Sequence, residues 1–490
     1  MKNNKGFCLK GATISSVHNA INNLEIKCSD LIEMYMERIE KYDRNGPKIN
    51  SVITINPKAL EIAHDLDERF KESGIKGPLH GIPVLLKDNV NTKDMPTTAG
   101  SIALEGIIPS EDAFITEKLK KAGAIILAKV NLHEFAVWGE TISSVLGQTL
   151  NPYDLTRTPG GSSGGTSAGI AADFGIIGLG TDTINSIRSP ASACSLVGLR
   201  PTVGLISRAG IVPYSLTQDT AGPIMRTVED TAKVLDIIAG YDPIDPATAW
   251  SIGHIPKSYT KYLRKDGLQG KRIGILNSFF GTKNIHKEVN AIIFNCLDDI
   301  KKNGGILIHI KEYIDADKLV NEVSVHLHEL KPHLNLYLEK LGSKSKVHSL
   351  NDIIISGKYH KGIEENIKYA ETLDINSDIY NRRLIKRFET QNTVMEIMAK
   401  YDLDAIAYPH QKRPVVKIGE SQVDRNGVLS SVTGFPSIVV PAGFTQPTDT
   451  APIGVPVGIE FLGRRLSEPI LLEIAYAFEQ TTKYHKPPVL

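Results

Sequence analysis

The stretch TPGGSSGGTSAGIAADFGIIGLGTDTINSIRSPASACSLVGLRPTVG, residues 158–204, is the part of the chain that says most about its fold and chemistry. It contains a Gly/Ser loop, then a short helix expected over 166–174 and an apolar strand expected over 176–180. A polar turn follows and ends at Ser186. The stretch holds two serine-bearing loops and no histidine, so any serine nucleophile here needs a different base.

The sequence on either side of this stretch repeats the same alternation of apolar runs and helices. Residues 82–86 and 124–128 are short apolar runs, and residues 114–122 between them have a helical pattern. Such runs are typical of sheet strands that are covered on both faces. Further elements of the same kind are expected as strands at 405–408, 437–440 and 457–461 and as a closing helix at 468–480. The pattern predicts an α/β fold with a central mixed β-sheet and helices on both faces.

The chain shows no linker, internal repeat or low-complexity tract, so we expect one domain over residues 1–490. Within it, residues 65–225 are predicted to form the core segment that carries the chemistry. Residues 245–400 are more charged and more helical, and we interpret them as a variable peripheral layer rather than a second domain, because strands resume afterwards.

The composition argues against several classes of partner. The 56 Lys and Arg residues balance 55 Asp and Glu residues, which leaves no bulk charge to attract nucleic acid or an anionic membrane. No run of about 18 apolar residues is present to span a bilayer. The four cysteines have no metal-ligand spacing and are expected to be reduced thiols. We therefore expect a cytoplasmic protein with a small-molecule partner, no nucleic acid or membrane partner, and a homodimer as one option.

Lys87 stands at the end of the apolar run Ile82-Pro83-Val84-Leu85-Leu86. A lysine at the mouth of a buried strand loses its proton more easily, because desolvation disfavours the charged ammonium group. A neutral amine is a competent general base. We therefore take Lys87 as the candidate base for serine chemistry.

The Gly/Ser loop at 160–165 allows more than one interpretation when it is taken alone. A flexible surface turn is the simplest, since glycine permits conformations that other residues avoid. The loop also fits the G-x-S-x-G nucleophile elbow of α/β-hydrolases, which requires a strand directly before it. The preceding residues, NPYDLTRTP, form a polar segment bounded by prolines, so we reject the elbow.

Three ordered motifs, GIPVLLKDN, PGGSSGGTSAG and GTDTINSIRSPAS, resemble those of the amidase signature family. The resemblance extends to KVNLHEFA, QDTAGP and the closing PVGIEFLG, and it is weakest over about 245–400. It implies the amidase signature fold and a Ser-cisSer-Lys triad. Carried over to this chain, Lys87 is the base, Ser162 is the serine after a cis peptide, and Ser186 is the nucleophile. The family's 24-residue spacing between the two serines selects Ser162 over Ser163.

The resemblance also implies a mechanism that needs no metal ion and no organic cofactor. Lys87 draws a proton from Ser162, which draws one from Ser186, whose oxygen then attacks the amide carbonyl. The oxyanion is implied to bind the backbone N–H groups of Thr183, Ile184, Asn185 and Ser186.

One feature of this chain departs from the family pattern. Ile184-Asn185 stands where the family usually has Gly-Gly just before the nucleophile. Backbone donors survive this change, but isoleucine does not readily adopt a positive φ, and Asn185 adds a side chain beside the site. We expect tolerated variation in an active enzyme, with a reshaped acyl pocket.

Four other residues near the motifs receive structural interpretations. Asp182 and Arg188 are expected to brace the nucleophile loop through hydrogen bonds. Cys194 lies in an apolar setting and is expected in the core, and His133 is expected to be structural.

The functional hypothesis is a free-standing amidase that hydrolyses the C–N bond of a small or medium carboxamide through a seryl acyl-enzyme. One alternative is the glutaminase subunit of a tRNA-dependent amidotransferase. Acyl transfer to an amine is another, and a non-catalytic binding scaffold is a third, motivated by Ile184-Asn185 alone. The substrate itself is not readable from these motifs.

Overall fold

Within residues 7–490, the part of the chain that this computed structural model describes, eleven strands form one mixed sheet and two more form a small hairpin. The first six residues of the domain predicted over 1–490 lie outside the described residues. The strands are β1 (Val52–Ile55), β2 (Pro83–Lys87), β3 (Ile125–Val130), β4 (Ile142–Ser143), β5 (Gly147–Gln148), β6 (Ile177–Asp182), β7 (Val197–Arg200), β8 (Thr220–Met225), β9 (Arg272–Leu276), β10 (Ile306–Ile310), β11 (Ala405–Pro409), β12 (Ser437–Phe444) and β13 (Pro456–Leu462).

The α-helices are spread along the whole described chain, between and beyond the strands. They are α1 (Ile14–Asn22), α2 (Cys28–Ile39), α3 (Ala59–Ser73), α4 (Phe114–Lys121), α5 (Gly164–Ala171), α6 (Arg188–Ala193), α7 (Val228–Ile238), α8 (Lys287–Lys302), α9 (Ala316–Lys318), α10 (His326–Leu341), α11 (Leu350–Ser356), α12 (Glu364–Thr372), α13 (Asp378–Lys400), α14 (Val428–Thr433) and α15 (Glu468–Thr482).

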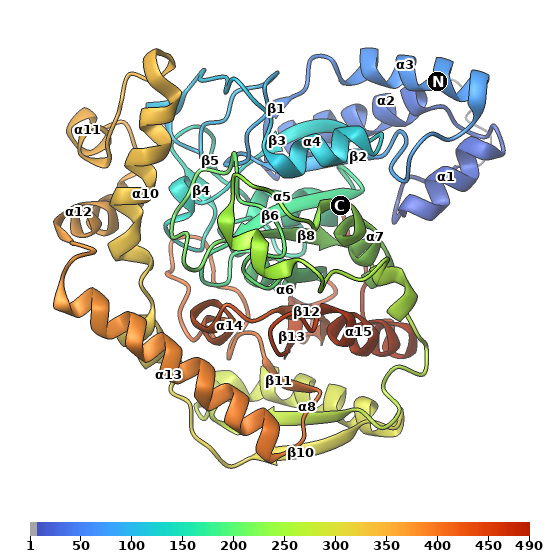
Figure 1. Cartoon of the computed structure of the whole chain (residues 1–490). Coiled ribbons are helices and arrows are strands. Elements are labelled where there is room, and N and C mark those ends of the chain that lie inside the picture. Colours follow the sequence, from blue (N-terminus) through green and yellow to red (C-terminus); the bar gives the residue numbers. More distant parts are fainter. Residues whose placement is uncertain (1–6) are drawn as a thin grey trace.

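The large sheet extends from the N-terminal helices at the top of Figure 1 to α8 and β10 at the bottom. Its strand order is β1-β3-β2-β6-β8-β7-β12-β13-β11-β9-β10. β2 runs parallel to both of its neighbours, β3 and β6, and β9 runs parallel to β10 and β11. The other neighbouring pairs are antiparallel. Lys87 and Asp182 therefore end adjacent parallel strands at the same edge of the sheet.

Both faces of the central strands are covered. Every residue of β2, β6, β7, β8 and β13 is buried. Because successive side chains of a strand point to opposite faces, only cover on both sides can bury them all. α5 and α6 contact each other and the central strands, and α15 packs against both α7 and α8. The predicted α/β fold with a mixed sheet and two-sided helix cover is confirmed.

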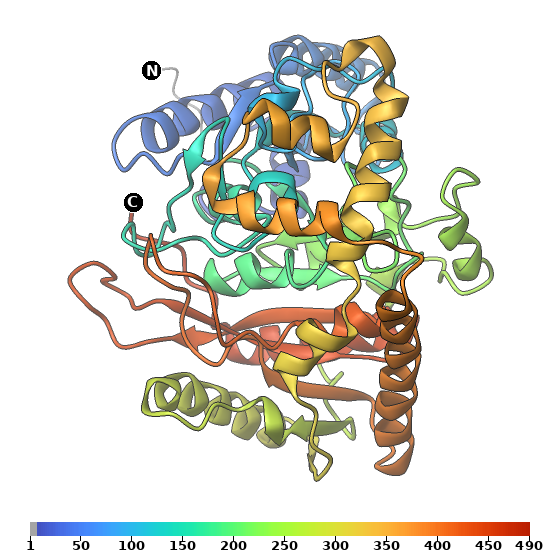
Figure 2. The same cartoon turned by 90° about the vertical axis from the view of Figure 1, so that its left-hand side faces the viewer.

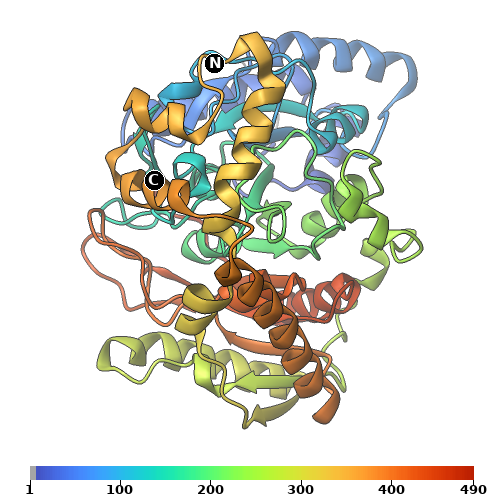
Figure 3. The ribbon, with the colours of Figure 1, turned by 60° about the vertical axis from the view of Figure 1, so that its left-hand side comes forward.

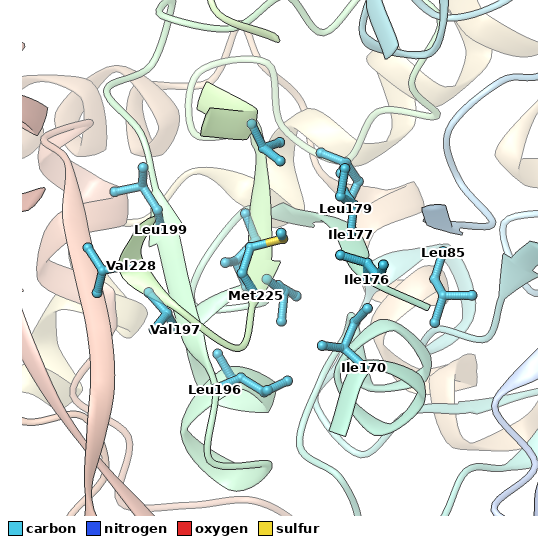
Figure 4. Packing of buried hydrophobic residues seen from close by; sticks show 14 of the residues in the cluster. Leu85, Ile170, Ile176, Ile177, Leu179, Leu196, Val197, Leu199, Met225 and Val228 are labelled. Atoms are coloured by element: carbon cyan, nitrogen blue, oxygen red, sulfur yellow. The ribbon is translucent and has the colours of Figure 1, made fainter. Parts of the chain in front are cut away.

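Leu85 of β2 belongs to the main apolar cluster, where Figure 4 shows its side chain on the side of Ile176 and Ile170. A Cβ placed on Gly169 of α5 would lie 2.7 Å from Leu85 Cδ1, and one on Gly175 would lie 2.8 Å from Leu85 Cγ. Glycine at these positions lets α5 and the following turn approach β2 closely. The helix that follows the Gly/Ser loop is thus held against the strand that ends at Lys87.

Six predicted strands are confirmed as β2, β3, β6, β11, β12 and β13, while the other strands of the sheet were not predicted. β7 reads VGLR and β8 reads TAGPIM, so neither is a continuous apolar run. The helix expected at 166–174 begins two residues earlier, at Gly164, and ends at Ala171. The helix therefore starts at Gly164-Gly165, which the sequence had assigned to the loop.

The segment 245–400, expected as a mostly helical layer, also supplies β9 and β10 at one end of the sheet. Figures 2 and 3 show α10 to α13, coloured yellow to dark orange, on one side of the molecule. Leu330, Leu334 and Leu338 of α10 belong to one apolar cluster with Phe135 and Tyr214. The layer therefore packs onto loops that lead to the candidate site.

Among the helices of residues 7–490, none is both long and apolar enough to cross a membrane.

Leu85→Ala tests the close packing of α5 on β2. Removing a fully buried leucine side chain leaves a cavity, so we expect the free energy of unfolding to fall by about 2–5 kcal/mol. Leu336→Ala on α10 is the matched control, because Leu336 is 55% exposed and should cost about 0.5 kcal/mol or less. Urea unfolding measures both, and equal costs would contradict this description of the core.

Candidate active site

Lys87, the last residue of β2, is completely buried at the centre of the candidate site. Its Nζ lies 2.7 Å from Ser162 Oγ and 2.8 Å from Thr181 Oγ1, and both contacts are hydrogen bonds. Asn89 Nδ2 donates to the same Thr181 hydroxyl at 3.0 Å. In the described chain no carboxylate oxygen lies within 4 Å of Lys87 Nζ.

Lys129, on the neighbouring strand β3, is a second buried lysine, and it differs from Lys87 in its partner. It is as buried as Lys87, but its Nζ forms an ion pair with Asp88 Oδ1 at 3.0 Å. Burial lowers the pKa of Lys129, and the adjacent Asp88 charge works against that shift. Lys87 has only hydroxyl and carbonyl oxygens at contact distance.

The environment of Lys87 accordingly favours the neutral amine. Burial lowers the pKa of Lys87 to about 7, although the more distant charges of Asp182 and Asp219 act in the opposite direction. A group with this pKa is partly neutral at physiological pH and can accept a proton. The arrangement therefore provides a base without a histidine.

Ser162 and Ser163 are adjacent but have different partners. Ser162 follows a cis peptide bond from Gly161, and its hydroxyl contacts Lys87. The Ser163 hydroxyl donates to Thr181 O at 3.1 Å and accepts from Thr181 N at 3.3 Å. Ser163 thus fastens the loop to the end of β6, and Ser162 is the serine that faces the amine.

The glycines of this loop are required by close contact with neighbouring backbone. A Cβ on Gly165 would lie 2.3 Å from Asn131 O, which no side chain can tolerate. Thr141 Oγ1 donates to Gly160 O at 2.7 Å and accepts from Gly164 N at 3.0 Å. The loop is therefore clamped on two sides rather than being a flexible surface turn.

Ser186 lies beside this loop and is 5% exposed. Ser163 N donates to Ser186 O at 3.2 Å, so the two serine-bearing loops are joined directly. Within residues 7–490, the backbone N–H groups of the four residues from Thr183 to Ser186 donate to no protein acceptor. Free N–H groups in a buried turn can bind an anionic oxygen.

The Ile184-Asn185 turn does not use the left-handed conformation that glycine favours, since neither residue has a positive φ. Ile184 packs against the apolar cluster that contains Phe279 and Leu429. Asn185 is buried, and its Nδ2 has no hydrogen-bond partner in the described chain. The two residues therefore differ in role, because Ile184 anchors the turn and Asn185 leaves an amide group free.

A buried network of charges holds the turn from behind. Arg188 Nε and Nη2 donate to the two carboxylate oxygens of Asp182 at 3.1 and 3.2 Å, and Nη1 donates to Glu460 Oε1 at 2.5 Å. Arg200 Nη1 donates to Asp182 Oδ1 at 2.9 Å. Arg188 Nη2 also donates to Ile184 O at 2.7 Å. The predicted bracing role of Asp182 and Arg188 is confirmed.

The two arginines and two carboxylates of this network balance in charge. Burial opposes ionisation of Asp182, yet Arg188 and Arg200 lower the pKa of its carboxyl group well below the usual range. Burial likewise opposes ionisation of Glu460, but Arg188 and then His410 lower the pKa of Glu460 to about 2. All four groups stay charged at neutral pH, so the turn rests on a rigid support.

His133 and Cys194 occupy the positions expected from the sequence. Cys194 is fully buried in the main core. His133 N donates to Ser162 O at 3.0 Å, and His133 Nδ1 accepts from Glu140 N at 3.1 Å. Burial lowers the pKa of His133 to about 3, so this imidazole is neutral. It supports the backbone of Ser162 rather than touching Lys87.

A narrow pocket opens beside Thr181 and Thr183, next to the turn that leads to Ser186. Its lining includes Thr181, Thr183, Tyr214 and Asp219, with Ile211, Val212, Pro213 and Leu216 on the apolar side. In residues 7–490 no group of three or more His, Cys, Asp or Glu side chains is placed to hold a metal ion. The site presents a serine–lysine arrangement beside a partly apolar pocket.

Thr181 and Tyr214 also belong to this region, and neither was predicted from the sequence. Thr181 precedes the DTINS turn and lies near the end of the strand next to β2, so the strand pairing alone brings it to Lys87. Tyr214 lies in the loop between β7 and β8 and lines the pocket, and no local pattern in the sequence indicates this position.

Several known proteins resemble this chain in sequence or fold over nearly their whole length. The Amidase family profile matches residues 30–472. A probable amidase of Arabidopsis thaliana is 36% identical, over 98% of this chain and 92% of that protein. A glutamyl-tRNA(Gln) amidotransferase subunit of Methanosarcina acetivorans is 32% identical, over 98% of this chain and 99% of that protein.

Among solved structures, the peptide amidase of Stenotrophomonas maltophilia superposes with a TM-score of 0.88 at 35% identity, and 98% of each chain is covered. The likeness thus includes the whole sheet and the helical layer. Together with the family profile, it shows that this chain belongs to the Amidase (amidase signature) family and is an amide-hydrolysing enzyme.

Proposed function

We propose that this enzyme hydrolyses the C–N bond of a linear, non-peptide carboxamide to a carboxylic acid and ammonia or an amine, with Ser186 as nucleophile, Ser162 as relay and Lys87 as base. The observation that carries this proposal is the hydrogen bond from the buried Lys87 amine to Ser162 Oγ. The different partner of Ser163, which is Thr181, supports the choice of Ser162.

The proposed reaction begins with a proton shift along the three residues. Neutral Lys87 takes the Ser162 proton while Ser162 takes the proton of Ser186, and Ser186 Oγ attacks the carbonyl carbon. The oxyanion that forms is bound by N–H groups of the turn Thr183–Ser186, which have no protein acceptor in the described structure. The same relay in reverse protonates the departing nitrogen, and water activated by the relay then releases the acid.

A second candidate is the glutaminase subunit of a tRNA-dependent amidotransferase. The match to the amidotransferase subunit of Methanosarcina acetivorans spans nearly the whole of both chains, which favours it. The higher identity to a probable amidase and the 0.88 TM-score with a peptide amidase favour a free-standing enzyme. Purification of the chain from its own cells, with identification of any stoichiometric protein partner, distinguishes the two.

The proposed reaction is tested by following ammonia release from a panel of amides with the purified protein. We expect turnover that is blocked by a fluorophosphonate, since such reagents react covalently with activated serines. Mass spectrometry should locate the label on Ser186. A label on another serine, or no turnover of any amide, would contradict the proposal.

Ser186→Ala should lower amide hydrolysis by about 10³-fold or more, because it removes the attacking oxygen. The variant should fold normally, since alanine at this loop position opens no large cavity. Ser163→Ala is the matched control: its hydroxyl bonds only backbone groups of Thr181, so its loss should be far smaller. If Ser186→Ala kept activity close to that of the wild type, the nucleophile would be another residue.

The pH dependence of hydrolysis should report Lys87. Only the neutral amine can accept the proton, so kcat/KM should rise with pH through about 7 and then level off. Lys87→Ala should remove this rise together with nearly all activity. Asp219→Asn removes a negative charge that favours the protonated amine, so the midpoint should move to lower pH. A midpoint near the pKa of about 10.4 of free lysine would contradict the proposed environment.

Single glycine variants of Ile184 and Asn185 separate anchoring from pocket shape. Ile184→Gly removes packing against the Phe279 cluster and should lower kcat for every amide, because the turn loses its anchor. Asn185→Gly removes an unpaired amide and should widen the range of accepted amides with a smaller effect on kcat. Steady-state kinetics on amides of increasing bulk measure both. If Asn185→Gly leaves the substrate profile unchanged, its side chain lies outside the pocket.

A further inference from the structure

Arg425 lies in the loop between β11 and α14, and its guanidinium group has no anionic partner. It is half-buried, and within residues 7–490 it forms no ion pair and no side-chain hydrogen bond. The group stacks on the ring of Trp138, whose centre lies 4.9 Å from Cζ. The buried Arg188 and Arg200 differ, because each binds a carboxylate. A cation that is stacked on one face keeps its N–H edge available for a ligand.

The guanidinium group of Arg425 lies against Gly139, which neighbours the loop that carries Ser162. A Cβ placed on Gly139 would lie 2.9 Å from Arg425 Nη1. Gly139 in turn touches the Gly/Ser loop, since a Cβ on Gly161 would lie 2.9 Å from Gly139 C. Arg425 is therefore separated from the Gly161-Ser162 peptide by a single residue of packing.

Two buried hydrogen-bond donors near Arg425 also have no partner. Tyr214 is 3% exposed and its hydroxyl bonds to nothing in the described chain. His133 is 2% exposed, and its Nε2 has no hydrogen-bond partner there either. Because His133 Nδ1 accepts a backbone N–H, the proton of the neutral ring belongs on Nε2. Buried donors in proteins are nearly always paired with a protein, water or ligand acceptor, so these two groups are available to an acceptor on a bound ligand.

The charge of Arg425 acts on both His133 and Tyr214. Burial is the main cause that lowers the pKa of His133, and the charges of His360 and Arg425 lower it further. Burial raises the pKa of Tyr214, and the Arg425 charge opposes that rise. Tyr214 also lines the pocket beside Thr181 and Thr183, which connects the region to the proposed oxyanion turn.

Glu140 is the carboxylate whose charge acts most on Arg425, and one of its two oxygens accepts two hydrogen bonds. Glu140 Oε1 accepts from Trp138 Nε1 at 2.8 Å and from Gln422 N at 2.7 Å. Its Oε2 lies 3.6 Å from His133 Nδ1. Glu140 thus holds Trp138 in place against the guanidinium group without forming an ion pair with it. Within residues 7–490, the Tyr214 hydroxyl and His133 Nε2 remain donors without a protein acceptor.

We propose that the substrate carries a carboxylate group in addition to its scissile amide, and that Arg425 binds this carboxylate with hydrogen bonds from the Tyr214 hydroxyl and His133 Nε2. The substrate class is then a half-amide of a dicarboxylic acid or a related amide acid. This inference rests on the proposed amidase function. It assigns to Arg425 a role in substrate selection and none in the proton relay.

The test compares half-amides of dicarboxylic acids of increasing chain length with neutral straight-chain amides of equal length. Wild-type kcat/KM should be about 10²-fold higher for the best half-amide than for its neutral counterpart, as expected for a charge-assisted, bidentate contact. Arg425→Gln should reduce that ratio to within a few-fold of one, and Arg425→Lys should restore part of it. Tyr214→Phe should reduce the ratio by about tenfold.

Arg413→Gln is the matched control, because Arg413 belongs to the same loop and pairs with Glu420. It should leave the ratio at the wild-type value. A wild-type enzyme that hydrolyses neutral amides equally well, or an Arg425→Gln variant that keeps the preference, would overturn this inference and leave the amidase proposal standing.

Calorimetric titration with the free dicarboxylates gives a readout that does not depend on turnover. Wild-type protein should bind the dicarboxylate of the preferred length, and Arg425→Gln should bind it about 10²-fold more weakly. If no amide is hydrolysed, the proposed function fails while such binding still supports the anion site. Absence of binding to the wild-type protein would overturn the anion site itself.

Discussion

The arrangement of the site depends on an amine that is buried without a counter-ion. Lys87 and Lys129 lie on neighbouring parallel strands and are equally inaccessible, but only Lys129 has a carboxylate at 3.0 Å. An unpaired ammonium group in that position is costly, so burial favours the neutral amine and lowers the pKa of Lys87 to about 7. The oxygens of Ser162 and Thr181 then serve as its hydrogen-bond partners. A single difference in pairing separates a structural lysine from a proposed base.

This constraint explains why the strongest charges near the site are kept at a distance and neutralise one another. Asp182 follows Thr181 directly, and a free carboxylate there would favour the protonated form of Lys87. Arg188 and Arg200 bind that carboxylate instead, and Arg188 also holds the carbonyl of Ile184. The same ion pairs thus reduce the field of Asp182 at the amine and fix the turn that carries the free N–H groups. One set of contacts therefore both fixes the turn and weakens the effect of Asp182 on the pKa of Lys87.

The sequence predicted the elements that lie close together along the chain. Continuous apolar runs identified β2, β3 and β6, and the end of β2 identified Lys87 as a buried amine. Short strands with internal glycine or proline, such as β7 and β8, carry no such signal. Pairing with the neighbouring strands stabilises them, and their own residues have little intrinsic preference for a strand. Ile184 would be strained only in a turn that needs a positive φ, as the Gly-Gly pattern suggested. The turn uses ordinary φ values, and the apolar cluster around Phe279 holds it in place.

The sequence predicts the reacting groups but not the substrate, and the reason lies in where the two sets of residues come from. The proposed reacting groups come from two adjacent parallel strands and the loops beside them, so a local pattern suffices to find them. The groups proposed to bind the rest of the substrate, His133, Tyr214 and Arg425, lie in three separate loops, which follow β3, β7 and β11. The approach of Tyr214 and Arg425 requires the full sheet order, in which β6, β8, β7, β12 and β13 lie between β2 and β11. It also requires the packing of α10 against the Tyr214 loop. Substrate choice can therefore change through loops that leave the Lys87–Ser162 contact untouched, which is how one fold can serve several amide substrates.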